Sequence, residues 1–243
     1  CVHAAALAEE WGDPAAFHQA NVIGTERVLA AARAVSLPRL VHVSTEAVLL
    51  GGRPIVNADE TWPIPDRPIG LYAVSKAQAE HRVRAAAADG LHAMIIRPRL
   101  IWGRGDTSVL PRLVAAVRSG QFAWIGGGAH RTSFCHVDNV CEGALRCAEN
   151  GRPGEVYFLT DGPPLPMRDF LTPILKTQGV DPGARSLPRP VAYTAAALLE
   201  WTPTERVDPW RPKEPTSRRP DPDRCGSRKL VDTARVWGIR VEE

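Results

Sequence analysis

The sequence predicts an α/β protein built on a doubly wound parallel sheet. Three short apolar segments carry this prediction, because each is typical of a strand buried inside such a sheet: residues 1–4, 40–43 and 94–96. Segments with apolar residues at helical spacing separate them. Strand, helix, strand, helix, strand is the order that lays parallel strands side by side with helices across the sheet. The length of 243 residues allows one large α/β domain with a small added lobe.

A helix is expected between the first two strands. Asp13 stands before Pro14, and this pair is typical of an N-cap followed by proline at the first helical position. Five residues then recur at helical spacing: Phe17, Ala20, Gly24, Val28 and Ala31. Pro38 ends the connection to the strand at 40–43.

A second helix is expected over about residues 72–88, after a polar loop over 44–70 that is rich in Gly and Pro. Gly90 ends this helix, and the strand at 94–96 follows. Beyond Arg97 the pattern loosens into shorter elements. These are helices over 109–118, 137–148, 167–177 and 189–200, with a strand at 156–158. Mixed short elements of this kind are typical of a lobe added to the sheet.

We therefore expect three parts in the chain. Residues 1–106 form the sheet domain, residues 107–201 form a substrate lobe with elements that return to the sheet, and residues 202–243 form a tail. Residues 202–229 hold six prolines and many charges but almost no aliphatic residues. They cannot offset the entropy of ordering by burying a core, so we expect this Pro/Arg-rich tail to be irregular.

Charge, apolar runs and cysteines exclude several classes of protein. The net charge is +3, and residues 202–229 alone carry it. Nucleic-acid binding requires basic residues gathered on a folded face, so this distribution argues against it. No apolar run approaches the ~20 residues of a membrane span and no basic leader opens the chain, so neither a transmembrane segment nor a signal peptide is expected. The five cysteines, odd in number and irregular in spacing, favour reduced thiols in a cytoplasmic protein. Cys135, Cys141 and Cys147 lack the short pairing of structural zinc sites, so no metal is expected.

Tyr72 and Lys76 are the strongest chemical signal. Residues four apart on a helix lie on one face, so these two side chains are neighbours. A free tyrosine has a pKa of about 10 and is a poor proton donor or acceptor at neutral pH. A nearby ammonium lowers that pKa, which makes a general acid/base for a carbonyl or an alcohol. The same spacing occurs by chance on many surface helices, so the pair alone leaves a structural role open.

Two hydroxyl groups follow the buried strand at 40–43. Ser44 and Thr45 stand at the carboxyl end of this strand, which is where ligands bind in open α/β sheets. The Thr45 hydroxyl can hydrogen-bond the same substrate oxygen that Tyr72 protonates. The alternative is that both residues only begin a turn.

Six segments together resemble the motifs of a known family, in the same order. They are Val2–Ala6 (H-x-A-A), Asn21–Thr25 (N-x-x-G-T), Val43–Thr45, Tyr72–Lys76 (Y-x-x-x-K), Arg97–Pro98 with Trp102–Asp106, and Phe134–Val140, which is similar to H-V-D-D-V with Asn139 in place of an Asp. On these motifs the chain, over roughly residues 1–200, resembles the extended short-chain dehydrogenases. That family includes nucleotide-sugar epimerases, dehydratases and 3β-hydroxysteroid dehydrogenases.

The resemblance implies a Rossmann-type NAD(P)-binding fold and a role for each matching residue. Tyr72 would be the general acid/base and Thr45 its hydroxyl partner, while Lys76 would hold the nicotinamide ribose and lower the pKa of Tyr72. Four further residues would touch or support the NAD or NADP cofactor: Ala4, Ala5, Asn21 and Pro98. Arg131 occupies a position where sugar-nucleotide members contact a substrate phosphate, and the alternative is a plain surface arginine.

Two segments are similar to the 3β-hydroxysteroid dehydrogenase branch: residues 53–65, and residues 187–200, where L-P-x-P leads into an Ala/Leu-rich stretch. A helix of the second kind would give an apolar wall to a substrate pocket, although ordinary core packing explains it equally well. One family motif is missing. No glycine-rich, pyrophosphate-binding turn precedes His3, so we expect a chain truncated at its N-terminus, with a partial sheet that lacks its first βαβ half.

Three functions remain in competition. The first is an NAD(P)-dependent oxidoreductase that transfers hydride at a hydroxyl or ketone of an apolar, steroid-like small molecule. The second is a nucleotide-sugar epimerase or dehydratase, which would need Arg131 to meet a substrate diphosphate. The third is a non-catalytic remnant that cannot bind cofactor. The oligomeric state is open as well, with a homodimer through the helix at 72–88 as one candidate.

Overall fold

The fold is described from a computed structural model for residues 1–9, 11–192 and 194. Its centre is a four-stranded parallel sheet in the order β1-β2-β3-β8. The strands are β1 (Val2–His3), β2 (Leu40–Val43), β3 (Ala93–Pro98) and β8 (Val156–Leu159). His42 pairs in register with His3 on one side and with Ile95 on the other. All six residues of β3 are buried, as expected of a strand that is covered on both faces.

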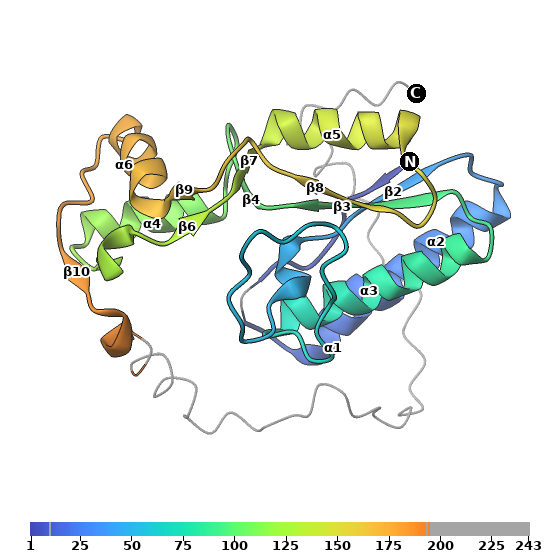
Figure 1. The fold of residues 1–243 in the computed structure, drawn as a ribbon, viewed down its shortest axis with the longest axis horizontal. Coiled ribbons are helices and arrows are strands. Elements are labelled where there is room, and N and C mark those ends of the chain that lie inside the picture. The colour runs from blue at the N-terminus through green and yellow to red at the C-terminus, as the bar shows by residue number, and fades with distance from the viewer. Residues whose placement is uncertain (10, 193, 195–243) are drawn as a thin grey trace, which may run out of the picture.

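Helices cover both faces of this sheet (Figure 1). On one face lie α1 (Pro14–Phe17), a π-helical turn (His18–Ile23), α2 (Gly24–Ala34) and α3 (Leu71–Ala88), and on the other lies α5 (Val137–Asn150). The first face packs Leu29 and Val83 into one core cluster with Ile95. The second packs Met94 against Ala144. The predicted doubly wound parallel α/β fold is therefore confirmed.

The predicted helix over 14–31 is present, but it is not regular. Asp13 caps it as expected, since its Oδ1 accepts a hydrogen bond from Ala15 N at 3.0 Å. The π-helical turn then interrupts the α-helical bonding, and α2 runs on to Ala34. The extra residue of the π-turn rotates the helix face that packs on the sheet. The buried positions after Phe17 therefore include Asn21, Thr25, Leu29 and Ala32, each one residue beyond the predicted face. This turn contains Asn21, which is buried and hydrogen-bonded to Ser75 of α3.

The remaining strands and α-helices form a lobe beside the sheet (Figure 1). They are β4 (Leu100–Trp102), α4 (Val109–Arg118), β5 (Trp124–Ile125), β6 (Arg131–Thr132), β7 (Phe134–His136), β9 (Leu165–Pro166), α6 (Met167–Thr177) and β10 (Ser186–Leu187). β4 pairs with β7 and β5 with β10, both in parallel, while β6 and β9 are antiparallel. A separate core cluster around Trp124, Leu171 and Leu175 holds the lobe together.

The later elements agree closely with the predicted ranges. α4 and α6 have the expected bounds, and α5 extends two residues further, to Asn150. The boundary predicted after residue 106 falls in the loop between β4 and α4. Of the helix predicted over 189–200, residues 189–192 and 194 are helical, and the rest lies outside the described residues together with the predicted tail. Within the described part of the chain, no helix is long and apolar enough to cross a membrane.

Candidate active site

The end of β2 and the start of α3 bring the three predicted catalytic residues together. Thr45 follows β2 in an extended conformation and caps the short 3₁₀ turn η2 (Glu46–Leu49), where its hydroxyl accepts from Ala47 N at 3.2 Å. Tyr72 and Lys76 lie one turn apart near the start of α3. Gly70 precedes this helix with a φ of 91°, a left-handed value that any side chain would strain.

The Tyr72 phenol lies beside the Thr45 hydroxyl. Burial raises the pKa of Tyr72 above its usual value, and the Thr45 hydroxyl opposes that shift. The predicted lowering of this pKa by Lys76 is not what the structure shows, because the lysine ammonium is held by other partners. Tyr72 is therefore a neutral phenol at neutral pH.

Lys76 is only 2% exposed. Its Nζ donates a hydrogen bond to Val43 O at 2.7 Å and lies 3.4 Å from His42 Nε2. Burial lowers the pKa of Lys76 to about 8, and the nearby Glu80 carboxylate opposes that shift. The ammonium is thus held against the last residues of β2, next to Thr45.

Two buried histidines lie beside Lys76, and neither is a predicted site residue. The ring centroids of His3 and His42 are 5.2 Å apart, and His3 Nε2 lies 3.0 Å from Thr25 Oγ1. Burial, and then the charge of Lys76, lowers the pKa of both, to about 4 for His3. Both rings are therefore neutral at neutral pH. A histidine inside the otherwise apolar strand Leu40–Val43 was the available signal for this cluster.

Among the predicted cofactor residues, Asn21 clamps the segment after β1 onto α3. Its amide nitrogen donates to Ser75 Oγ at 2.9 Å and to Leu7 O at 3.0 Å, and its oxygen accepts from Leu7 N at 2.7 Å. Ala4 and Ala5 are exposed directly after β1, at the carboxyl end of the sheet. The structure thus brings small exposed residues to the same end of the sheet as the catalytic candidates.

Pro98 and Arg131 lie in other surroundings. Pro98 is buried at the end of β3, where it pairs in register with Leu159 of β8. Arg131 lies exposed on β6 of the lobe, and its Nη2 donates a hydrogen bond to Pro164 O. Its guanidinium is therefore held by the backbone of the lobe itself.

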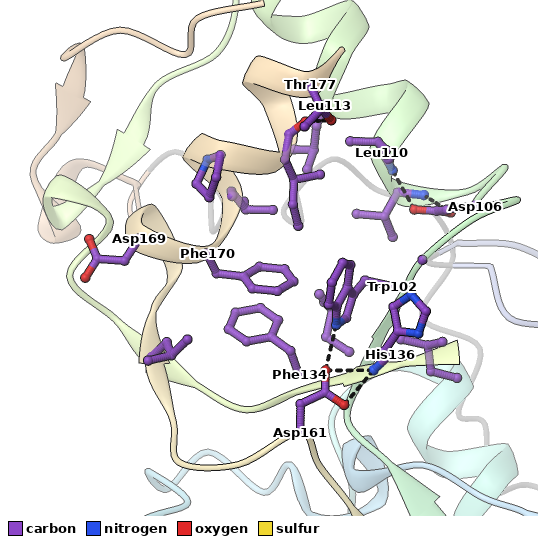
Figure 2. Close-up of a pocket in the computed structure, with 18 of the residues that line it drawn as sticks. Trp102, Asp106, Leu110, Leu113, Phe134, His136, Asp161, Asp169, Phe170 and Thr177 are labelled. Atoms are coloured by element: carbon purple, nitrogen blue, oxygen red, sulfur yellow. Dashed lines mark hydrogen bonds between the residues drawn. The ribbon is translucent and has the colours of Figure 1, made fainter. Parts of the chain in front are cut away.

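An apolar cavity of about 750 Å³ opens in the lobe (Figure 2). Its wall includes Trp102 of β4, Leu110 and Leu113 of α4, Phe134 of β7, and Phe170 and Ile174 of α6. The Phe134 and Phe170 rings stack with centroids 3.4 Å apart, and Trp102 meets Phe170 edge-on at 5.4 Å. This cavity could not be predicted from the sequence, because separate strands, helices and loops contribute its residues and no local pattern joins them.

One carboxylate organises the polar side of this cavity (Figure 2). Asp161 accepts hydrogen bonds from Trp102 Nε1 at 2.8 Å, His136 N at 2.8 Å and Asn139 Nδ2 at 2.7 Å. Burial tends to raise the pKa of Asp161, but these hydrogen bonds outweigh burial and lower it. Asp161 therefore stays charged and fixes Trp102 in the cavity wall.

Gly103 approaches His136 so closely that an added Cβ would lie 2.9 Å from the imidazole Nε2.

The fold and the motif-bearing residues define a dinucleotide-binding class of protein, and comparison with known proteins specifies the family. The chain belongs to the NAD dependent epimerase/dehydratase family, whose model matches residues 1–159. The predicted membership in the extended short-chain dehydrogenases is confirmed by this match.

Individual relatives agree with the family. The chain is 50% identical over 218 residues to the 4-hydroxy-2-methyl-3-oxo-4-farnesyl-3,4-dihydroquinoline-1-oxide ketoreductase of Stigmatella aurantiaca, covering 90% of this chain and 63% of that protein. It is 34% identical over 166 residues to a 3 beta-hydroxysteroid dehydrogenase/Delta 5→4-isomerase of Mycobacterium tuberculosis, covering 65% and 45%. Among solved structures, DesIV, a dTDP-glucose 4,6-dehydratase from Streptomyces venezuelae with NAD and TYD bound, matches with a TM-score of 0.64 at 28% identity, covering 77% and 60%. The chain thus spans less than two thirds of the length of each of these proteins.

Proposed function

We propose that this chain acts as an NAD(P)-dependent oxidoreductase that transfers hydride at a hydroxyl or ketone of an apolar small molecule. The observation that carries the proposal is the Tyr72 phenol beside the Thr45 hydroxyl, with Lys76 one helical turn further along α3. Membership in the family supports this reaction class. So does the similarity to a ketoreductase of a farnesylated quinoline oxide.

The residues at the carboxyl end of the sheet fit a nicotinamide cofactor. Ala4 and Ala5 are small and exposed, so the backbone of their segment is open to a flat ligand. Open α/β sheets bind dinucleotides at this end, where Thr45 and Tyr72 also lie. We assign NAD or NADP to this site, with Lys76 as the cation beside it. Asn21 and Pro98 would support the site from within the fold, because both are buried.

The chemistry divides between the cofactor and the chain. When bound, the reduced nicotinamide supplies the hydride. Tyr72 enters ketone reduction as the acid, because burial keeps its phenol protonated, and it gives its proton to the substrate oxygen. Thr45 donates a hydrogen bond to the same oxygen, and Lys76 holds the end of the strand that carries Thr45 through its bond to Val43 O. In alcohol oxidation the proton moves back from the substrate hydroxyl to Tyr72.

The lobe favours an apolar substrate over a nucleotide sugar. The cavity wall presents aromatic and aliphatic side chains from Trp102 to Ile174, which suit an alkyl or prenyl chain. Arg131, the predicted phosphate contact, already donates to Pro164 O. A nucleotide-sugar epimerase or dehydratase remains the second candidate, because the fold is similar to that of DesIV.

Location and assembly belong to the proposal as well. The four cysteines in the described part of the chain, Cys1, Cys135, Cys141 and Cys147, are free thiols. Free thiols agree with the reducing cytoplasm that we propose. A homodimer through α3 stays a prediction, and light scattering of the purified chain tests it directly.

NADH or NADPH is expected to bind saturably when titrated into the purified chain and followed by nicotinamide fluorescence. Circular dichroism checks folding in the same sample. In the presence of cofactor, a thermal-shift panel is expected to respond to a long-chain β-keto acid and not to dTDP-glucose. A response to dTDP-glucose alone would favour the epimerase or dehydratase. A folded chain that binds neither dinucleotide would contradict the enzyme and leave the non-catalytic remnant.

Ile174→Gln is expected to lower kcat/KM for a long-chain ketone by about tenfold while leaving a short-chain ketone nearly unaffected. Ile174 lines the cavity from α6, so the amide replaces apolar contact with the distal part of a long substrate. The matched control is Ile125→Gln, because Ile125 is 54% exposed outside the cavity wall. Equal losses for both ketones, or the same loss in the control, would remove the cavity from substrate binding.

A further inference from the structure

Glu80 is a buried carboxylate on the catalytic face of α3. It follows Tyr72 and Lys76 at the same four-residue spacing, so all three side chains lie along one face of the helix. Its side chain is 0% exposed. A carboxylate at such a depth requires donors for both oxygens, because an uncompensated buried charge is strongly unfavourable.

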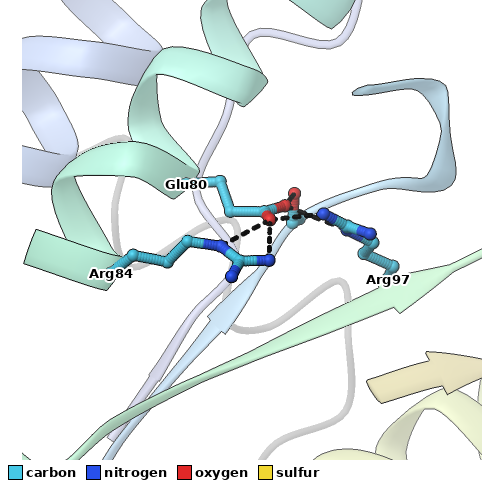
Figure 3. A network of polar contacts seen from close by, with 4 residues as sticks. Glu80, Arg84 and Arg97 are labelled. Atoms are coloured by element: carbon cyan, nitrogen blue, oxygen red, sulfur yellow. Dashed lines mark hydrogen bonds and ion pairs between the residues drawn. The ribbon is translucent and has the colours of Figure 1, made fainter. Parts of the chain in front are cut away.

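Three residues supply these donors (Figure 3). Glu80 Oε2 accepts from Ser44 Oγ at 2.9 Å and from Arg97 Nε at 3.1 Å. Glu80 Oε1 accepts from Arg97 Nη2 at 2.5 Å and from Arg84 Nε and Nη2, each at 3.2 Å. Ser44 stands at the end of β2, Arg97 lies near the end of β3, and Arg84 lies one turn further along α3. The carboxylate is therefore the junction of one helix and two strand ends.

The hydrogen bonds of Glu80 fix residues that adjoin the proposed catalytic residues Thr45 and Tyr72. Ser44 directly precedes Thr45, and it is fixed twice, because its N also donates to Ile96 O at 2.8 Å. Tyr72, the partner of Thr45, lies two helical turns before Glu80 on the same rigid helix. One buried side chain is thus linked to Thr45 through the preceding Ser44 and to Tyr72 through helix α3.

We propose that Glu80 is a positioning residue for the Thr45–Tyr72 pair, which it aligns by holding Ser44 to helix α3. The role rests on the proposed function, in which Thr45 and Tyr72 share the substrate oxygen. Glu80 reaches neither hydroxyl, so it acts only through Ser44 and through the helix. Arg97 holds the carboxylate in place and thereby keeps one Glu80 oxygen aimed at Ser44.

Ser44→Ala tests the proposal without changing any charge. The substitution removes the bond from Ser44 Oγ to Glu80 and leaves the Glu80–Arg97 ion pair intact. We expect Thr45 to lose its fixed position, so that kcat falls roughly tenfold while the KM for cofactor is unchanged. Ser44→Thr keeps the hydroxyl and is expected to restore kcat. Ser119→Ala, the same substitution at an exposed residue after α4, is expected to have no effect.

A second measurement does not depend on turnover. With ¹³C-labelled tyrosine, the Cζ chemical shift of Tyr72 reports the hydrogen bond of its hydroxyl. The chain has three tyrosines, so Tyr72→Phe assigns the signal. We expect this shift to change in Ser44→Ala and to stay unchanged in Ser44→Thr and Ser119→Ala, while the Tyr157 signal stays constant in all of them.

The outcomes separate the role from simple stabilisation. A folded Ser44→Ala chain with an unchanged Tyr72 shift and an unchanged kcat would overturn the proposal, whatever its melting temperature. If Ser44→Ala fails to fold, Glu80→Asp replaces it, because the shorter side chain keeps the charge but draws back from Ser44, and the same two readouts decide. Turnover that survives Tyr72→Phe would defeat the proposed function, and the Tyr72 shift would still decide the positioning role.

Discussion

Tyr72→Phe is expected to lower turnover by a factor of about 10² or more and to leave the affinity for NADH or NADPH nearly unchanged. Phenylalanine keeps the buried ring but removes the hydroxyl that lies beside Thr45 and that we propose as the proton donor. Without that proton the reduced substrate oxygen must take one from water, which is a slower and unaligned donor. The measurement compares kcat for ketone reduction with the dissociation constant of the cofactor, obtained by fluorescence titration of the same preparation.

The control for this substitution is Tyr157→Phe. The Tyr157 hydroxyl donates to Glu155 Oε2 at 2.7 Å on the edge strand β8, so it also loses a hydrogen bond, but away from Thr45. The kcat of the Tyr157→Phe variant is expected to match that of the unaltered chain. Near-normal turnover in Tyr72→Phe would remove the phenol from the mechanism. A parallel loss of cofactor affinity would instead assign Tyr72 to binding.

The sheet could be predicted because its signal is local. Val41 and Ile95 stand in short apolar runs, and such runs suit a strand that is covered on both faces. The cap at Asp13 was equally visible, because the residue and its neighbour Pro14 are adjacent in the sequence. The π-helical turn at His18–Ile23 differs from the prediction, because its extra residue moves the buried face one position along, to residues such as Thr25 and Leu29.

The candidate site could be predicted only as far as each motif lies within one element. Tyr72 and Lys76 share a helix, so their spacing alone made them neighbours. The contact of Lys76 with His42 joins α3 to β2, and no sequence spacing encodes that pairing. The pKa of Tyr72 was misjudged for the same reason: burial by distant segments raises it, and Lys76 is bound to β2.

Glu80→Gln is expected to lower the free energy of unfolding by about 3–5 kcal/mol. The substitution leaves the Arg97 guanidinium, which is 0% exposed, inside the fold without its anionic partner. The Arg97 side chain hydrogen-bonds to Glu80, its Nη1 lacks a hydrogen bond, and its Cζ lies 5.7 Å from the centroid of the Phe158 ring. Urea unfolding followed by circular dichroism measures the loss, with an unchanged m-value as the check that the same fold is unfolding.

Two further variants decide whether the loss comes from the stranded charge. Arg84→Gln removes the ion pair between Arg84 and Glu80. The Arg84 side chain is 41% exposed, so this substitution is expected to change the free energy of unfolding by only ~0–1 kcal/mol. Glu80→Leu combined with Arg97→Met removes both buried charges together. Because an apolar pair of similar volume is often as stable as a buried ion pair, the double variant is expected to regain most of the stability that Glu80→Gln loses. A double variant as unstable as Glu80→Gln would mean that the hydrogen bonds of the carboxylate to Ser44 and Arg84, and not the charge of Arg97, hold α3 on the sheet.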